Sequence, residues 1–71
     1  MYSTITTKLE NHIMTITFNR PESLNSFNLP MMQDLVAAYR SANQDDDVRV
    51  IIVTGAGRAF CAGADLSSGD N

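Results

Sequence analysis

The sequence holds one cysteine and one histidine, and both scarcities limit the chemistry that it supports. Cys61 alone cannot form a disulfide within the chain, and a single thiol suits a reducing compartment. His12 has no cysteine or second histidine at the spacing of a metal site, so we expect no bound metal. Neither of the two cross-links that commonly stabilise very small domains is therefore expected.

Basic clusters and long apolar runs are also missing. The 5 Lys and Arg residues are outnumbered by 8 Asp and Glu, and the net charge of −3 argues against a nucleic-acid partner. No apolar run approaches the length of a membrane span, and residues 1–8 lack the apolar core of a secretion signal. We expect a cytoplasmic protein with no membrane partner.

The length of 71 residues allows one domain at most. The composition is that of an ordinary globular protein, with 44% hydrophobic and 18% charged residues. At this size the gain from burial and the cost in chain entropy nearly cancel, so small domains usually need a cross-link or a partner. A chain of this size without a cross-link is therefore expected to be at most one marginal domain.

Period-two alternation, rich in Ile and Thr, indicates strands at residues 4–9 and 13–18. One side of the alternation holds Ile5, Thr7, Leu9, Met14, Ile16 and Phe18. Asn11 lies between the strands and tolerates left-handed backbone geometry, so the pattern predicts a β-hairpin. Pro21 follows it and cannot donate to a sheet.

The period changes to that of an amphipathic helix over residues 29–42. Asn28 is a suitable N-cap, Pro30 is tolerated in the first turn, and Phe27 could pack against Met32. We expect one apolar stripe of the helix to consist of Met32, Leu35, Val36, Tyr39 and Ala42. The two strands of the hairpin offer about one half-buried face, so they cannot cover both this stripe and the apolar residues 50–53 that follow.

A strand is predicted over residues 49–54, after a solvated acidic connection at residues 45–47. Residues 50–53 are consecutive β-branched side chains, a pattern typical of a strand that is buried on both faces. The loop that follows leaves the end of this strand, which is where open α/β folds build their sites.

The glycine-rich loop at residues 54–65 admits more than one ligand. Gly55 and Gly57 begin a dinucleotide-binding pattern, but Ala59 and Cys61 stand where its third glycine is required, and Phe60 is bulky. A phosphate-binding P-loop would need Gly-Lys-Ser or Gly-Lys-Thr, which does not follow. A nucleotide-binding fragment is thus the less favoured interpretation.

Residues 62–64, Ala-Gly-Ala, suit a different ligand. Small residues let the backbone approach a ligand closely, and backbone amides aimed at one point stabilise a developing oxyanion. Asp65 could cap the turn or helix that follows and so orient these amides. The residues alone indicate a site for an oxyanion or a phosphate.

Two longer segments narrow this choice. Residues 50–66, VIIVTGAGRAFCAGADL, and residues 19–27, NRPESLNSF, resemble the enoyl-CoA hydratase/isomerase (crotonase-type) family. Together the segments are specific, and in order they span essentially the whole chain. The resemblance implies an α/β fold: the hairpin, helix, strand and loop would form the amino-terminal part of a ββα spiral.

The resemblance also implies roles for individual residues. The backbone amide of Ala64 would be one of two donors to a thioester oxygen. Ala62 and Leu66 would hold the adenine of coenzyme A, and Leu24, Asn25 and Ser26 would lie along the rest of it. CoA would enter as the substrate's thioester, with no separate cofactor.

Some of these positions have simpler interpretations. Members of the family often carry a basic residue near Glu22, and this chain does not, so Arg20 or Arg58 would have to meet the CoA phosphate. Arg58 could instead be a solvated loop charge, Asn25 a turn residue and Cys61 a small buried side chain.

The chain lacks the acid/base residues of the chemistry. Glu10 and Glu22 do not match the family's catalytic glutamates, and the second oxyanion amide is also missing. We therefore expect a part of an enzyme that needs the remainder of its fold as partner, acts on acyl-CoA, and forms a trimer or dimer of trimers when complete. The alternative is a non-catalytic, truncated or partner-binding module.

Overall fold

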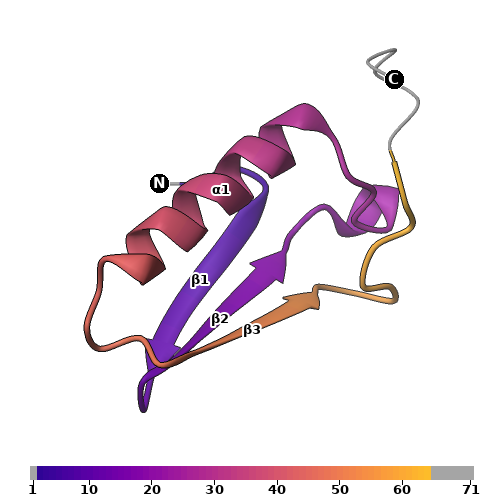
Figure 1. The fold of residues 1–71 in the computed structure, drawn as a ribbon. Helices are drawn as coiled ribbons and strands as arrows, with labels where there is room; N and C mark the ends of the chain where they lie inside the picture. Colours follow the sequence, from indigo (N-terminus) through magenta and orange to yellow (C-terminus); the bar gives the residue numbers. More distant parts are fainter. Residues whose placement is uncertain (1, 65–71) are drawn as a thin grey trace.

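The computed structural model describes residues 2–64, which form a three-stranded sheet with one helix across one of its faces (Figure 1). The elements are β1 (Ile5–Glu10), β2 (Ile13–Phe18), a short 3-10 helix η1 (Pro21–Ser23), α1 (Leu29–Asn43) and β3 (Val50–Gly55). The sheet order is β1-β2-β3. β1 and β2 pair antiparallel, whereas β2 and β3 pair parallel across the α1 crossover. The expected α/β fold is confirmed, and each expected element lies within one residue of its observed bounds.

The hairpin turn consists of Asn11 and His12, which both have a positive φ, 53° and 66°. This is the backbone that matches the twist of two antiparallel strands joined by a two-residue loop. The turn also contacts the start of β3, because the His12 carbonyl accepts a hydrogen bond from the Arg49 amide at 2.8 Å. His12 is thus a turn residue, as its isolation in the sequence suggests.

The core lies between the sheet and α1. Ile5, Ile16 and Phe18 are buried on the helix-facing side of the sheet, against Met31 and Ala38 of α1. The register places Ile16 between Thr7 of β1 and Val53 of β3, and Ile16 is fully buried. The alternation predicted for β2 is confirmed.

The predicted apolar stripe of α1 was incomplete, because it left out two residues that pack on the sheet. Ala42 is buried as expected and Leu35 is half-buried, but the other buried residues are Met31 and Ala38. Met32, Val36 and Tyr39 are exposed, together with Leu29. The helix carries two adjacent apolar stripes, and the sheet covers only one of them. We call the exposed one, residues Leu29, Met32, Val36 and Tyr39, the outer stripe.

Burial of the third strand on both faces was also a wrong expectation for this chain. Ile51 and Val53 face the helix and are half-buried, whereas Val50 and Ile52 on the opposite face are 51% and 46% exposed. α1 covers one face only, and no described residue forms a second layer. The β-branched run therefore has one apolar side without cover in the part of the chain that the structure describes.

Two side chains fix α1 at its beginning and to the sheet. Asn28 is the N-cap, and its Oδ1 accepts a hydrogen bond from the Met31 amide at 3.0 Å, as predicted. Asp34 reaches the start of β1, where its Oδ2 accepts from the Thr4 hydroxyl at 2.7 Å and the Thr4 amide at 2.9 Å. These bonds to Thr4 lower the pKa of the Asp34 carboxyl below its usual value.

The solvated connection at residues 45–47 is held by its own chain. The Asp45 carboxylate accepts from the Asp47 amide at 2.9 Å, an arrangement typical of a local turn.

Within residues 2–64, α1 is too short and too polar to cross a membrane.

Candidate functional site

The loop that leaves β3 begins at Gly55, where the chain doubles back on itself. A Cβ at Gly55 would lie 2.5 Å from the carbonyl oxygens of Ala59 and Phe60. Real side chains do not approach backbone atoms so closely, so this position requires glycine. The space beside Gly55 is filled by its own loop and offers no room for a pyrophosphate, which is a physical argument against the dinucleotide interpretation.

Asn25 connects this loop to the segment that follows β2. Its side chain is fully buried. The Nδ2 donates to the carbonyl oxygens of Ala56 at 2.8 Å and Ala59 at 2.7 Å, and the Oδ1 accepts from the Arg20 amide at 2.7 Å. We call this set of three hydrogen bonds the Asn25 clamp. Asn25 also has a φ of 56°, so it is a turn residue as well.

The preceding residue is conformationally strained. Leu24 has a φ of 52°, a left-handed geometry that branched side chains rarely adopt and that costs about 1–2 kcal/mol. This geometry turns the Leu24 carbonyl toward the loop, where it accepts from the Ala62 amide at 3.1 Å. Strain of this kind persists only where surrounding contacts compensate for it, and it concentrates at functional sites.

Arg20 organises the same segment. Its guanidinium donates to the Ser26 carbonyl at 2.6 Å and lies 3.5 Å from the Ser23 hydroxyl. Its backbone carbonyl accepts from the Asn25 amide at 2.8 Å. Arg20 therefore binds its own loop, and a contact with a CoA phosphate stays a prediction.

The two segments that carry the family resemblance lie side by side. The Ala62 amide donates to the Leu24 carbonyl, and the Phe27 amide donates to the Gly63 carbonyl at 2.7 Å. Phe27 and Ala64 form an isolated parallel bridge. In such a parallel pair, where Phe27 directs its N–H toward the other segment, the opposite residue, Ala64, directs its own N–H away from Phe27. The Ala64 amide is thus not used by Phe27, and residues 62–64 are exposed.

The other predicted site residues are distributed around this pairing. Leu24 is 38% exposed, Ser26 is buried, and Arg58 is exposed in the loop. The Cys61 thiol is half-buried, 3.9 Å from the Gly63 carbonyl, which suits a packed side chain. Leu66 and Asp65 lie outside the described residues.

Sequence reasoning did not single out Phe60 as a site residue. Its ring lies 5.3 Å from that of Phe18, centroid to centroid, with a tilt of 40°. It is nevertheless 56% exposed and follows Ala59, whose carbonyl binds Asn25. An exposed aromatic in a loop of small residues was the available signal, and it was interpreted only as evidence against a glycine pattern.

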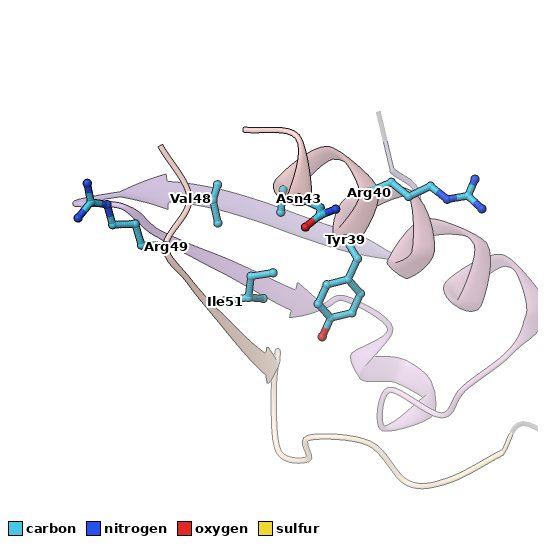
Figure 2. Close-up of a pocket in the computed structure, with 7 residues that line it drawn as sticks. Tyr39, Arg40, Asn43, Val48, Arg49 and Ile51 are labelled. Carbon is cyan, nitrogen blue, oxygen red and sulfur yellow. The ribbon is translucent and has the colours of Figure 1, made fainter. Parts of the chain in front are cut away.

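A separate cleft of about 420 Å³ opens at the other end of β3. Figure 2 shows Tyr39 of α1 and Ile51 of β3 extending toward the same gap, with Asn43 and Val48 nearby. None of the predicted site residues lines it. The cleft lies between the last turn of α1 and the beginning of β3. It is separate from the loop at residues 56–64.

Among residues 2–64, His, Cys, Asp and Glu side chains form no group that could hold a metal ion. The loop at residues 56–64 also presents backbone amides and carbonyls, beside the side chains of Arg58 and Cys61. Amides in a loop of small side chains match the requirements of an oxyanion site.

Comparison with known proteins assigns this arrangement to a class. The model of the enoyl-CoA hydratase/isomerase family matches residues 8–71, which is most of the chain. The chain belongs to the enoyl-CoA hydratase/isomerase family, and its fold is the amino-terminal part of the crotonase-type spiral.

Particular relatives sharpen that assignment. The chain is 46% identical over 67 residues to the 1,2-epoxyphenylacetyl-CoA isomerase of Escherichia coli K12, covering 94% of this chain and 26% of the isomerase. It is 48% identical over 59 residues to a probable peroxisomal enoyl-CoA hydratase 1 of Arabidopsis thaliana, covering 83% and 22%. A crystal structure of an enoyl-CoA hydratase/isomerase from Mycobacterium paratuberculosis superposes with a TM-score of 0.89 at 47% identity, covering 93% of this chain and 26% of that one. The chain thus spans about a quarter of the length of these relatives.

Proposed function

We propose that this chain is the part of an acyl-CoA-processing enzyme that supplies one oxyanion-hole amide, from Ala64, and part of the CoA site. The reaction is hydration or isomerisation of an acyl-CoA thioester. CoA enters as part of the substrate, and the site requires no separate cofactor. Ala62, Leu66 and the main chain of residues 24–26 contact the CoA moiety, with Arg20 or Arg58 near its phosphates.

The chemical argument starts from the thioester. Adding water to the double bond, or moving it, places negative charge on the thioester oxygen as an enolate forms. An amide already aimed at that oxygen stabilises this charge without reorganising during the reaction. A second amide and the acid/base carboxylates come from the remainder of the fold, because Glu10 and Glu22 match neither catalytic position.

One observation carries the proposal: the two segments that resemble the family pair side by side, with residues 62–64 exposed and the Ala64 amide directed away from Phe27. The Ala62 amide and the Gly63 carbonyl are bonded to the segment at residues 24–27. A ligand would therefore bind residues 62–64 from the side that faces away from this segment.

Reconstitution tests this function. The 71-residue chain is purified together with a complementing polypeptide, defined as the part of the Arabidopsis relative that follows the matched region. With crotonyl-CoA as the probe, we expect hydration by the mixture, seen as loss of the conjugated thioester absorbance, and none by either polypeptide alone. Hydration by the 71-residue chain without a second polypeptide would contradict the proposal.

A substitution tests the oxyanion role in the same complex. Ala64→Pro removes the backbone N–H, and loss of one oxyanion donor typically costs about 3 kcal/mol of transition-state stabilisation. We expect kcat to fall by a factor of 10² to 10³ while circular dichroism stays unchanged. A kcat close to that of the unmodified complex would show that another group binds the oxygen.

The partner follows from the uncovered apolar surface. The outer stripe of α1 and the open face of β3 are apolar, and we propose that the remainder of the fold covers them, with a homo-oligomer formed by the complete enzyme. Intact mass measurement with gel filtration decides this. A folded, monodisperse species that contains only the mass of this chain would contradict it.

The same exposed stripe favours a second candidate, a non-catalytic module that only pairs with another polypeptide. The two candidates differ in turnover, because the module would associate with the complementing polypeptide without hydrating crotonyl-CoA. We keep the cytoplasm as the predicted location, although the name of one relative places that relative in the peroxisome.

A further inference from the structure

The Asn25 clamp is the most completely buried polar arrangement in the described part of the chain, and the resemblance to the family leaves its purpose open. Asn25 was expected to lie along CoA, yet its carboxamide is fully buried. Both Nδ2 protons are donated to carbonyls at 2.7 and 2.8 Å, and the Oδ1 accepts at 2.7 Å. A side chain with these bonds already formed has little capacity left for a ligand.

The clamp holds the beginning of the loop whose end carries the proposed oxyanion amide. Ala56 and Ala59 lie on either side of Gly57, which has a φ of 83°. Gly55 packs against the backbone carbonyls of Ala59 and Phe60. The far end of the loop is fixed by the Ala62 amide on the Leu24 carbonyl. Residues 24 and 25 thereby hold both ends of the loop, and the Phe27 amide on the Gly63 carbonyl is a further attachment beside Ala64.

The backbone and the side chain of Asn25 contribute separately. Its positive φ, together with that of Leu24, turns the chain so that the Leu24 carbonyl faces Ala62. Its carboxamide then donates to the part-buried carbonyls of Ala56 and Ala59, and removing the donor of such a group is costly. One residue thus sets both the path of its own segment and the position of the loop opposite.

We propose that Asn25 is a positioning residue: its carboxamide sets the path of residues 56–64 and so aims the Ala64 amide at the thioester oxygen. This inference rests on the proposed oxyanion role of Ala64. It assigns the side chain of Asn25 no contact with substrate. A displacement of about 1 Å in such a donor can cost about 100-fold in rate.

Asn25→Asp is the sharpest variant because it keeps the shape of the side chain. One oxygen still accepts from the Arg20 amide, but the other faces two carbonyl oxygens with no proton to donate. We expect kcat for crotonyl-CoA in the reconstituted complex to fall by about 100-fold, with a much smaller change in KM. Lowering the pH protonates the introduced carboxyl, returns one O–H donor, and should restore part of kcat.

Asn11→Asp is the matched control. Asn11 also has a positive φ, 53°, but it lies in the exposed hairpin turn. We expect its kcat, KM and pH profile to match those of the unmodified complex. Asn25→Gly complements both variants, because glycine keeps the left-handed backbone and removes only the carboxamide; we expect it to lose kcat as Asn25→Asp does, without recovery at low pH.

Hydrogen–deuterium exchange separates this inference from the proposed function. In both Asn25 variants we expect faster exchange at residues 56–64 and unchanged protection in β1 and β2. If the unmodified complex does not hydrate crotonyl-CoA, the oxyanion proposal fails, and the exchange data still decide whether Asn25 sets the loop.

Three results would overturn the inference. A folded Asn25→Asp complex with unchanged kcat and exchange would show that the clamp does not aim the loop. A loss confined to KM would make Asn25 a CoA contact instead. Loss of protection across β1 and β2 in both variants would show that Asn25 stabilises the whole fold rather than the loop.

Discussion

The loop region around Asn25 and the outer stripe of α1 are opposites within one small chain. In the loop, buried polar groups find their partners within the chain, from the Asn25 carboxamide to the Leu24 carbonyl. On the outer stripe, Met32, Val36 and Tyr39 are 43%, 42% and 41% exposed. Polar groups are satisfied inside the chain, whereas apolar surface is left for something else to cover.

The difference follows from how the two kinds of interaction work. A hydrogen bond needs a partner at a set distance and direction, so a site built from such bonds must be specified by nearby residues. The free energy gained by apolar burial has no directional requirement and is roughly proportional to the buried area. A second polypeptide can therefore provide the cover that this chain lacks. The chain thus holds the path of its own loop in place but leaves apolar surface uncovered.

The largest expected effect compares two isoleucines of the same sheet. Ile16 is fully buried against α1, whereas Ile52 is on the uncovered face. In the reconstituted complex we expect Ile16→Ala to lower the free energy of unfolding by about 4 kcal/mol and Ile52→Ala by clearly less, because only the second polypeptide covers Ile52. Urea denaturation followed by circular dichroism measures both. A larger loss at Ile52 than at Ile16 would contradict the comparison.

Two glycines of the loop give the next effect. Gly55→Ala places a Cβ 2.5 Å from two backbone carbonyl oxygens, and we expect a loss of about 3 kcal/mol because backbone atoms cannot yield as side chains do. Gly63→Ala meets nothing within 4 Å and is strained only by its φ of 108°, which should cost about 1 kcal/mol. Thermal unfolding of the reconstituted complex compares them, and a milder effect at Gly55 than at Gly63 would contradict this packing.

The outer stripe can be tested by charge. Val36→Glu puts a carboxylate into the surface that we expect the complementing polypeptide to cover. Ser41→Glu introduces the same charge at an exposed position of α1 away from the stripe. Burying a Val side chain contributes about 1.5–3 kcal/mol, so we expect at least tenfold weaker association for Val36→Glu and little change for Ser41→Glu. Titration by fluorescence anisotropy measures both, and equal affinities would show that the stripe stays exposed.

The smallest effect is the pH dependence contributed by Asp34. Its folded-state pKa is lowered by the bonds to Thr4, so the unfolded chain binds the proton more readily. The stabilisation is present above the ordinary pKa of about 3.9 and is lost as the pH falls through the lower, folded value. We expect Asp34→Asn to flatten the acid limb of the stability curve, and an unchanged limb would assign that dependence to other carboxylates.

The sequence predicted the elements well because their signals are local. Period-two alternation placed β1 and β2, and Asn28 marked the first turn of α1 through a bond to a residue three positions away. The residues by which α1 meets the sheet, Met31 and Ala38, were not predicted, because the helix is apolar over two adjacent stripes and periodicity cannot say which one meets the sheet. The sequence did predict that the hairpin would leave apolar surface uncovered. It did not predict which face of β3 this would be, because β-branched residues indicate a strand suited to burial and not which polypeptide buries it.

The site was predicted only as far as motifs could identify it. The resemblance identified residues 62–64 and 24–26 as candidates, and the structure places these two segments beside each other. The bonds of the Asn25 side chain to Ala56 and Ala59 could not be predicted, because they join residues 31 and 34 positions apart. Such partners are determined by the three-dimensional path of the chain, which local patterns do not encode.

The parallel pairing of β2 with β3 has a consequence for the order of folding. The β1–β2 hairpin can form as soon as its own residues are available, on the microsecond scale of isolated hairpins. β3 pairs with β2 only after the α1 crossover between them has formed. Pairings between residues distant in sequence form more slowly because the intervening chain must be ordered first. Asn25 can reach Ala56 and Ala59 only once β3 lies in register beside β2. The Asn25 clamp therefore forms after the β1–β2 hairpin, once the crossover has brought the two halves of the segment together.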